Sequence, residues 1–112
     1  DSGLSQLKPA VQPLLEKVTV FILDHPEVSI EIHGHTDDRP ISNQRYPSNW
    51  ELSADRASQV AKALVRQGVH PQRLSIRGFG EYRPLVANDS AQKRLKNRRV
   101  EIQFSQIPLN SH

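Results

Sequence analysis

The stretch at residues 28–37, VSIEIHGHTD, joins a strand pattern to a group of polar side chains. Its first half alternates apolar and polar residues, which predicts a β-strand with one buried face. His33, His35 and Asp37 would share one face if the strand continued to that point. The end of this strand is therefore a candidate metal site, a candidate catalytic site, or a place that holds a charged ligand without chemistry.

An amphipathic helix is predicted before this strand, and another after it. The first follows a stripe of apolar residues at three- and four-residue spacing from Leu4 to Ile22. Pro13 lies within this stripe and favours a late start or a kink, because an interior proline loses a backbone hydrogen bond. The second helix ends at Gly68, which is a good stop signal.

The start of the second helix has two candidates. Ser48 stands three residues before Glu51, which is the spacing of a capping box, and Ser53 is the other plausible N-cap.

The remaining sequence predicts two strands and one short helix. RLSIRGFG at 73–80 and RRVEIQFSQ at 98–106 alternate as strands do, and Asp89 and Ser90 can cap a helix that runs through Leu95. Helix and strand thus alternate three times. This order predicts a small α/β or α+β sandwich, with the helices covering one face of a sheet.

Composition narrows the classes of function. The chain has 112 residues, which suits one domain, and no cysteine, which excludes disulfides, thiolate catalysis and thiolate metal sites. A net charge of +3 mildly favours anionic partners. We expect no nucleic acid among them, because the dense basic cluster is confined to KRLKNRR at 93–99 and few aromatic residues are available for base stacking.

Metal binding and catalysis are both weakly supported by the residues. His33, His35 and Asp37 offer two nitrogens and one oxygen, the ligand types that zinc accepts. However, no glutamate is placed as a partner base, and a polar His-x-His in a half-buried strand is more often structural. Asp37 and Asp38 would point to opposite faces of a strand, and no nucleophile elbow is present. We therefore expect no metal, no cofactor and no catalytic residue.

A charged ligand could be held by Asp37 together with Arg56. Asp37 follows the strand end, where it would attract an ammonium group. Arg56 lies early in the next helix, near its free backbone N–H groups, and can grip a carboxylate with two hydrogen bonds. Together they suit a zwitterion, such as the free end of an amino acid. The alternative, equally supported by the residues alone, is an internal ion pair between Asp37 and Arg56.

Four ordered blocks of this sequence resemble the OmpA-like peptidoglycan-binding domain family, which includes OmpA, Pal and MotB. The blocks are GHTD at 34–37, NWELSADRA at 49–57, GFG at 78–80 and NRRV at 97–100. The resemblance covers nearly the whole chain. The loop DRPISNQRYPS at 38–48 is longer than in the OmpA and Pal branches and resembles the MotB branch of flagellar stators.

The resemblance implies an α/β two-layer sandwich, with the helices packed on one face of a mixed sheet. Its element order would be β-α-β-α-β-α-β, with the first strand cut off before Asp1. It implies an OmpA-like domain over residues 1–106 and a loosely ordered tail over 107–112. It further implies a periplasmic domain that forms a homodimer, in a protein that an absent N-terminal helix anchors in the bacterial inner membrane beside a stator partner.

For the site, the resemblance implies non-catalytic binding of the peptidoglycan stem peptide through its diaminopimelate residue. Asp37 would hold the ammonium end, and Arg56 would grip the carboxylate with help from backbone amides at 49–53. The other expected ligand-binding residues are Asn49, Thr36, Leu52, Ser53 and Arg98, the last with a competing structural role at a helix end.

Three alternatives stay open from the sequence. One is a wall anchor of a secretion system or a lipoprotein. Another is a purely structural assembly module, in which Asp37 and Arg56 pair internally. The third is a metal-dependent hydrolase at His33, His35 and Asp37.

Overall fold

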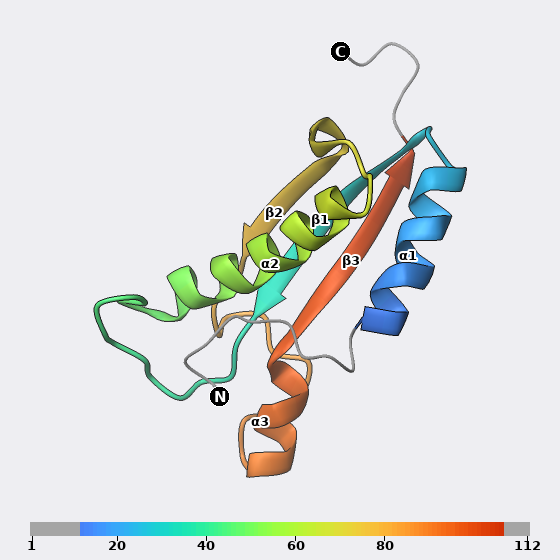
Figure 1. The fold of residues 1–112 in the computed structure, drawn as a ribbon. Helices are drawn as coiled ribbons and strands as arrows, with labels where there is room; N and C mark the ends of the chain where they lie inside the picture. The colour runs from blue at the N-terminus through green and yellow to red at the C-terminus, as the bar shows by residue number, and fades with distance from the viewer. Residues whose placement is uncertain (1–11, 107–112) are drawn as a thin grey trace.

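Helices α1 and α2 lie against one face of a three-stranded sheet in the computed structural model, which describes residues 12–106 (Figure 1). The elements in chain order are α1 (Gln12–Asp24), β1 (Val28–His35), α2 (Asn49–Arg66), the 3-10 helix η2 (Pro71–Arg73), β2 (Leu74–Gly78), α3 (Ala91–Asn97) and β3 (Arg99–Gln106). This arrangement confirms the predicted α/β two-layer sandwich. The short helix η2 was not predicted.

The sheet is mixed, with β1 in the centre. β1 pairs in parallel with β2 and antiparallel with β3, so that Ile32 lies opposite Ile76 on one side and Ile102 on the other. The expected strand before Asp1 stays a prediction. The start of the predicted first helix and the predicted tail at 107–112 lie outside the described residues.

Side chains from α1, β1 and α2 form one hydrophobic core. Ile30 and Ile32 of β1 point into it, as the alternation in the sequence predicts, and both are almost fully buried. Ile22 of α1 and Leu64 of α2 meet them there. Burying one such side chain is worth about 1.5–3 kcal/mol, so this cluster supplies the main force that holds the helical layer on the sheet.

The N-cap of α2 is Ser48, the first of the two candidates. Its hydroxyl accepts a hydrogen bond from the backbone N–H of Trp50 and donates one to the Glu51 carboxylate, which completes the predicted capping box. Ser53 lies inside the helix instead. At the other end, the backbone at Gly68 has a φ of 108° and its N–H bonds to the Val65 carbonyl, which turns the chain out of the helix.

The third helix follows its sequence signal, and the structure describes α1 over Gln12–Asp24, which includes Pro13. Ser90 caps α3 by accepting from the backbone N–H of Lys93. Within residues 12–106, no helix combines the length and the apolar character that crossing a membrane requires.

Arg73 ties the end of α1 to the sheet. Its guanidinium donates to the carbonyls of Ile22, His25 and Val28 at 2.5–3.0 Å. These three carbonyls belong to the last turn of α1, the connecting turn and the first residue of β1. One side chain therefore fixes how the chain passes from the helical layer into the central strand.

The N-terminal half of α2 touches the strands at two glycines. A Cβ atom added at Gly34 would lie 1.9 Å from the backbone oxygen of Ser53, and one added at Gly78 would lie 2.7 Å from the backbone nitrogen of Ala54. No side chain fits at either position. This close approach fixes the distance between α2 and the ends of β1 and β2.

Gly34→Ala is expected to destabilise the domain by at least about 3 kcal/mol, because the methyl group meets backbone that cannot move aside. Gly68→Ala is the matched control, since its added Cβ meets nothing within 4 Å and only the positive φ causes strain. That control should cost about 1–2 kcal/mol. Urea unfolding of both variants measures the difference, and equal losses would contradict the close approach.

Candidate ligand-binding site

Asp37 lies two residues beyond β1 with its carboxylate buried between arginines. Only 4% of the residue is exposed. One carboxylate oxygen accepts the backbone N–H of Arg39 at 3.0 Å, and the other accepts Nε of the same residue at 3.1 Å. Nε of Arg98 lies 3.1 Å from that second oxygen, but its N–H does not point at it, so this contact is an ion pair rather than a directed hydrogen bond.

Arg56 contributes a further positive charge to this cluster from the second turn of α2. Burial lowers the pKa of its guanidinium, and the neighbouring charge of Arg98 lowers it further, while Asp37 and Tyr46 act in the opposite direction. An arginine remains charged even so. The structure thus brings Asp37, Arg56 and Arg98 together as the sequence predicts, and it adds Arg39.

Asn49 connects the loop after β1 to the start of α2. Its side-chain amide donates to the backbone carbonyls of Asp37 and Arg39, at 3.4 and 3.1 Å, and approaches the Glu81 carboxylate at 3.4 Å. Because the residue is 6% exposed, its role in this structure is to hold the loop that carries Asp37 and Arg39.

The other predicted ligand-binding residues are buried beneath the cluster. The Ser53 hydroxyl accepts the backbone N–H of Gly80 at 2.9 Å and donates to the Trp50 carbonyl. Thr36 bonds through its backbone N–H to the Gly80 carbonyl. Leu52 is 3% exposed and faces the interior. In this structure these residues support the site from below and present little surface to a ligand.

The long loop at 38–48 is anchored to α2 through Tyr46. This side chain is buried, and its hydroxyl donates to the Asp55 carboxylate at 2.5 Å. Asn43 accepts the backbone N–H groups of Arg45 and Tyr46, which forms a tight turn inside the loop. The loop therefore has a defined conformation beside the Asp37 cluster.

The backbone amides at the start of α2 already have partners. The Ser48 hydroxyl accepts from the backbone N–H of Trp50. The pKa of the Glu51 carboxyl is lowered mainly by the hydrogen bond from that hydroxyl and further by the backbone N–H of Glu51 itself. The predicted help from amides at 49–53 would require a ligand to compete with these caps.

Arg39 is the site residue that sequence reasoning missed. It comes two residues after Asp37 in DDRP, at a spacing that lets its backbone and its side chain reach the same carboxylate. This short spacing between Asp37 and Arg39 is the sequence signal that could have identified Arg39. Asp38, by contrast, turns away and pairs with Arg94 at 2.9 Å.

The two histidines of β1 belong to a separate cluster on the face of the sheet opposite α2. His33, His35 and Glu101 each offer a potential ligand atom, and the three atoms lie within 4.8 Å of one another. β1 ends at His35, and the residue that completes this group is Glu101 rather than Asp37. The grouping of His33, His35 and Asp37 that a metal-dependent hydrolase would need is therefore not the one that forms among the described residues.

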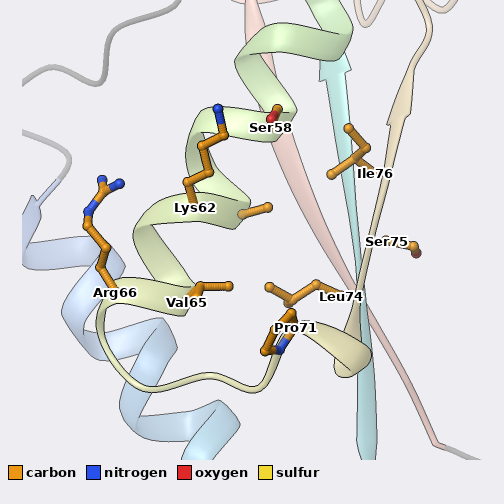
Figure 2. Close-up of a pocket in the computed structure, with 9 residues that line it drawn as sticks. Ser58, Lys62, Val65, Arg66, Pro71, Leu74, Ser75 and Ile76 are labelled. Atoms are coloured by element: carbon orange, nitrogen blue, oxygen red, sulfur yellow. The ribbon is translucent and has the colours of Figure 1, made fainter.

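A groove of about 530 Å³ lies between the C-terminal half of α2 and β2. Figure 2 shows Val65 on the helix pointing toward Leu74 and Pro71, with Lys62 and Arg66 extending away from them. This groove is mostly apolar and does not include Asp37 or its partners. We therefore base the candidate site on the charge cluster.

Ser53→Ala is expected to lower the free energy of unfolding by roughly 1–3 kcal/mol, because the buried N–H of Gly80 loses its partner. Ser58→Ala, on the same helix and half-buried, is the control and should change stability by less than about 0.5 kcal/mol. Urea unfolding compares the two. A neutral Ser53→Ala would mean that Gly80 finds another acceptor.

Comparison with known proteins places the chain in a family. Residues 1–98 match the OmpA family. Motility protein B of Helicobacter pylori is 42% identical over 92 residues, which are 81% of this chain and 36% of that protein. The probable lipoprotein YiaD of Escherichia coli is 36% identical over 107 residues, which are 96% of this chain and 47% of that protein. The chain thus spans less than half the length of these curated relatives.

Solved structures share this fold, and two of them illustrate the match. The crystal structure of the C-terminal domain of Helicobacter pylori MotB matches with a TM-score of 0.88 at 36% identity, covering 96% of this chain and 83% of that one. The cell wall anchor of the T6SS from Pseudomonas aeruginosa matches with a TM-score of 0.83 at 34% identity, covering 96% of this chain and 74% of that one. With its four sequence blocks, its fold and the match over residues 1–98, the chain belongs to the OmpA family.

Proposed function

We propose that this domain binds the stem peptide of peptidoglycan without cleaving it, through the free end of its diaminopimelate residue. The observation that carries the proposal is the buried carboxylate of Asp37, surrounded by the charges of Arg39, Arg56 and Arg98 at the end of the central strand. A negative group flanked by positive groups is complementary to a zwitterion, which has an ammonium and a carboxylate on one carbon.

Arg39 occupies the position that the ligand ammonium takes in this proposal. Its side chain is 51% exposed and comes from the loop, whereas the side chain of Arg98 is only 23% exposed. Half-exposed ion pairs contribute little net free energy. Arg39 is therefore the partner that leaves most easily, and Asp37 then accepts the ammonium while Arg56 binds the ligand carboxylate.

The role proposed for Asp37 is that of an acceptor, not a catalyst. Its two oxygens are already engaged by guanidinium and backbone N–H groups, so a ligand ammonium replaces one cation with another. In this proposal Arg98 stays in place throughout and keeps the carboxylate oriented.

At the level of the whole protein, we propose a wall anchor for a membrane complex of the flagellar stator type. The long loop at 38–48 and the likeness to proteins named Motility protein B support this choice. The domain would act in the periplasm as a homodimer, tethered by an N-terminal helix in the inner membrane beside a stator partner. Two tethered copies raise the effective affinity of a weak site.

An anchor of another assembly is the second candidate. Its support is the likeness to a protein described as the cell wall anchor of the T6SS, and to a probable lipoprotein. Both candidates use the same site.

Binding is tested by co-sedimentation with purified diaminopimelate-type peptidoglycan. The parent should pellet, whereas Asp37→Asn and Arg56→Gln should bind at least tenfold more weakly, because each removes one half of the zwitterion grip. Asp38→Asn and Arg66→Gln are matched controls on the neighbouring residue and the same helix, and they should pellet like the parent. Thermal melts check that all variants are folded. A parent that stays in solution contradicts the proposal, as do folded controls that lose binding equally.

Arg39→Ala is expected to strengthen binding of a soluble diaminopimelate-containing tripeptide severalfold, because it removes the cation that competes for Asp37. Arg45→Ala is the control in the same loop, since Arg45 pairs with Asp55 at 3.9 Å instead. Isothermal titration calorimetry measures both. Weaker binding by Arg39→Ala would identify Arg39 as a ligand contact rather than a competitor.

A further inference from the structure

The face of the sheet that points away from α2 carries two histidines and a carboxylate in register. Gly34 lies against α2, so its neighbours His33 and His35 project to the opposite side. Glu101 lies directly across from His33 on β3. The three side chains thus present potential ligand atoms within 4.8 Å of one another, although Glu101 is far from the two histidines in the sequence.

His35 is buried without a hydrogen-bond partner. The residue is 3% exposed, and neither ring nitrogen makes a hydrogen bond. Its Nε2 lies 3.8 Å from Oε1 of Glu101, which is beyond hydrogen-bonding distance. Buried polar groups nearly always have partners, and one without a partner points to a missing group. A metal ion placed between the imidazole and the carboxylate would supply it.

The surroundings of these three side chains orient them for coordination. Nε2 of His33 lies 2.6 Å from a Glu31 carboxylate oxygen. A carboxylate that accepts from one ring nitrogen leaves the other nitrogen with the lone pair that a metal needs. Arg99 binds Oε2 of Glu101 at 2.7 Å, while Oε1 is the oxygen on the side of His35.

Aromatic packing holds the two imidazole rings in place. The ring of Phe79 stacks on His35 with centroids 5.1 Å apart and meets His33 edge-on at 5.0 Å.

We propose that His33, His35 and Glu101 form a binding site for a transition-metal dication such as Zn²⁺, with Glu31 as the carboxylate that orients His33. Two imidazoles and one carboxylate favour Zn²⁺, Ni²⁺ or Cu²⁺ over Mg²⁺ and Ca²⁺, which prefer all-oxygen sites. Ligand atoms on one tetrahedral Zn²⁺ are about 3.3 Å apart, so atoms that now lie up to 4.8 Å apart must approach by up to about 1.5 Å.

Positive charges near the cluster limit the affinity. Arg99 and Arg83 both act on His35, and Arg77 lies 3.3 Å from Glu31. We therefore expect micromolar rather than nanomolar binding. The site shares no residue with the Asp37 cluster, so its test does not depend on the proposed peptidoglycan binding.

Calorimetric titration of the untagged, chelator-treated domain with ZnCl₂ at neutral pH tests the site. One equivalent should bind with micromolar Kd, and MgCl₂ should give no binding heat. Glu101→Gln and His33→Asn should each weaken Zn²⁺ binding at least tenfold. His70→Asn is the matched control, because it removes a histidine elsewhere and keeps a side chain able to cap η2. It should bind like the parent.

His35 is not replaced in these tests, because it is buried and its replacement can unfold the domain. Absorption of bound Co²⁺ provides a second measurement instead. The parent and His70→Asn should give visible bands of equal intensity, and Glu101→Gln should lose them. The proposal is overturned if Zn²⁺ fails to bind at micromolar concentration, if Mg²⁺ binds equally well, or if Glu101→Gln and His33→Asn match the parent.

Discussion

The direct contact between the start of α2 and the strands at Gly34 and Gly78 is the constraint on which the rest of the domain depends. With no side chain between them, helix and sheet come close enough for Ser53 to reach the backbone of Gly80. The same approach lets Asn49 reach the loop that follows β1. The charge cluster is thus positioned by backbone packing at the strand ends, and its polar side chains are held by a rigid support.

Charge balance stabilises the buried carboxylate of Asp37. A buried carboxylate requires compensation, and Arg39 and Arg98 provide it from two different segments of the chain. The two partners differ in exposure, since the side chain of Arg39 is 51% exposed and that of Arg98 is 23% exposed. In the proposed function, Arg39 is therefore the partner that a ligand cation replaces.

Sequence reasoning succeeded where the signal is local. The alternation in β1, the capping box at Ser48 with Glu51 and the cap at Ser90 all depend on residues a few positions apart, and the structure confirms each. It failed where cross-strand register decides the outcome. Glu101 joins the histidines only because β3 pairs antiparallel with β1 in one register, and no local pattern encodes that. Ser53 had a local interpretation as an N-cap, whereas tertiary packing gives it a buried role under the site.

The clamp made by Arg73 has a mechanical consequence. Its guanidinium holds carbonyls from the last turn of α1, the following turn and the first residue of β1, all from a position just before β2. A load that pulls α1 away from the sheet therefore meets several hydrogen bonds that must break together. Bonds loaded in parallel resist force better than bonds that open one at a time, so this clamp strengthens the junction between α1 and the sheet.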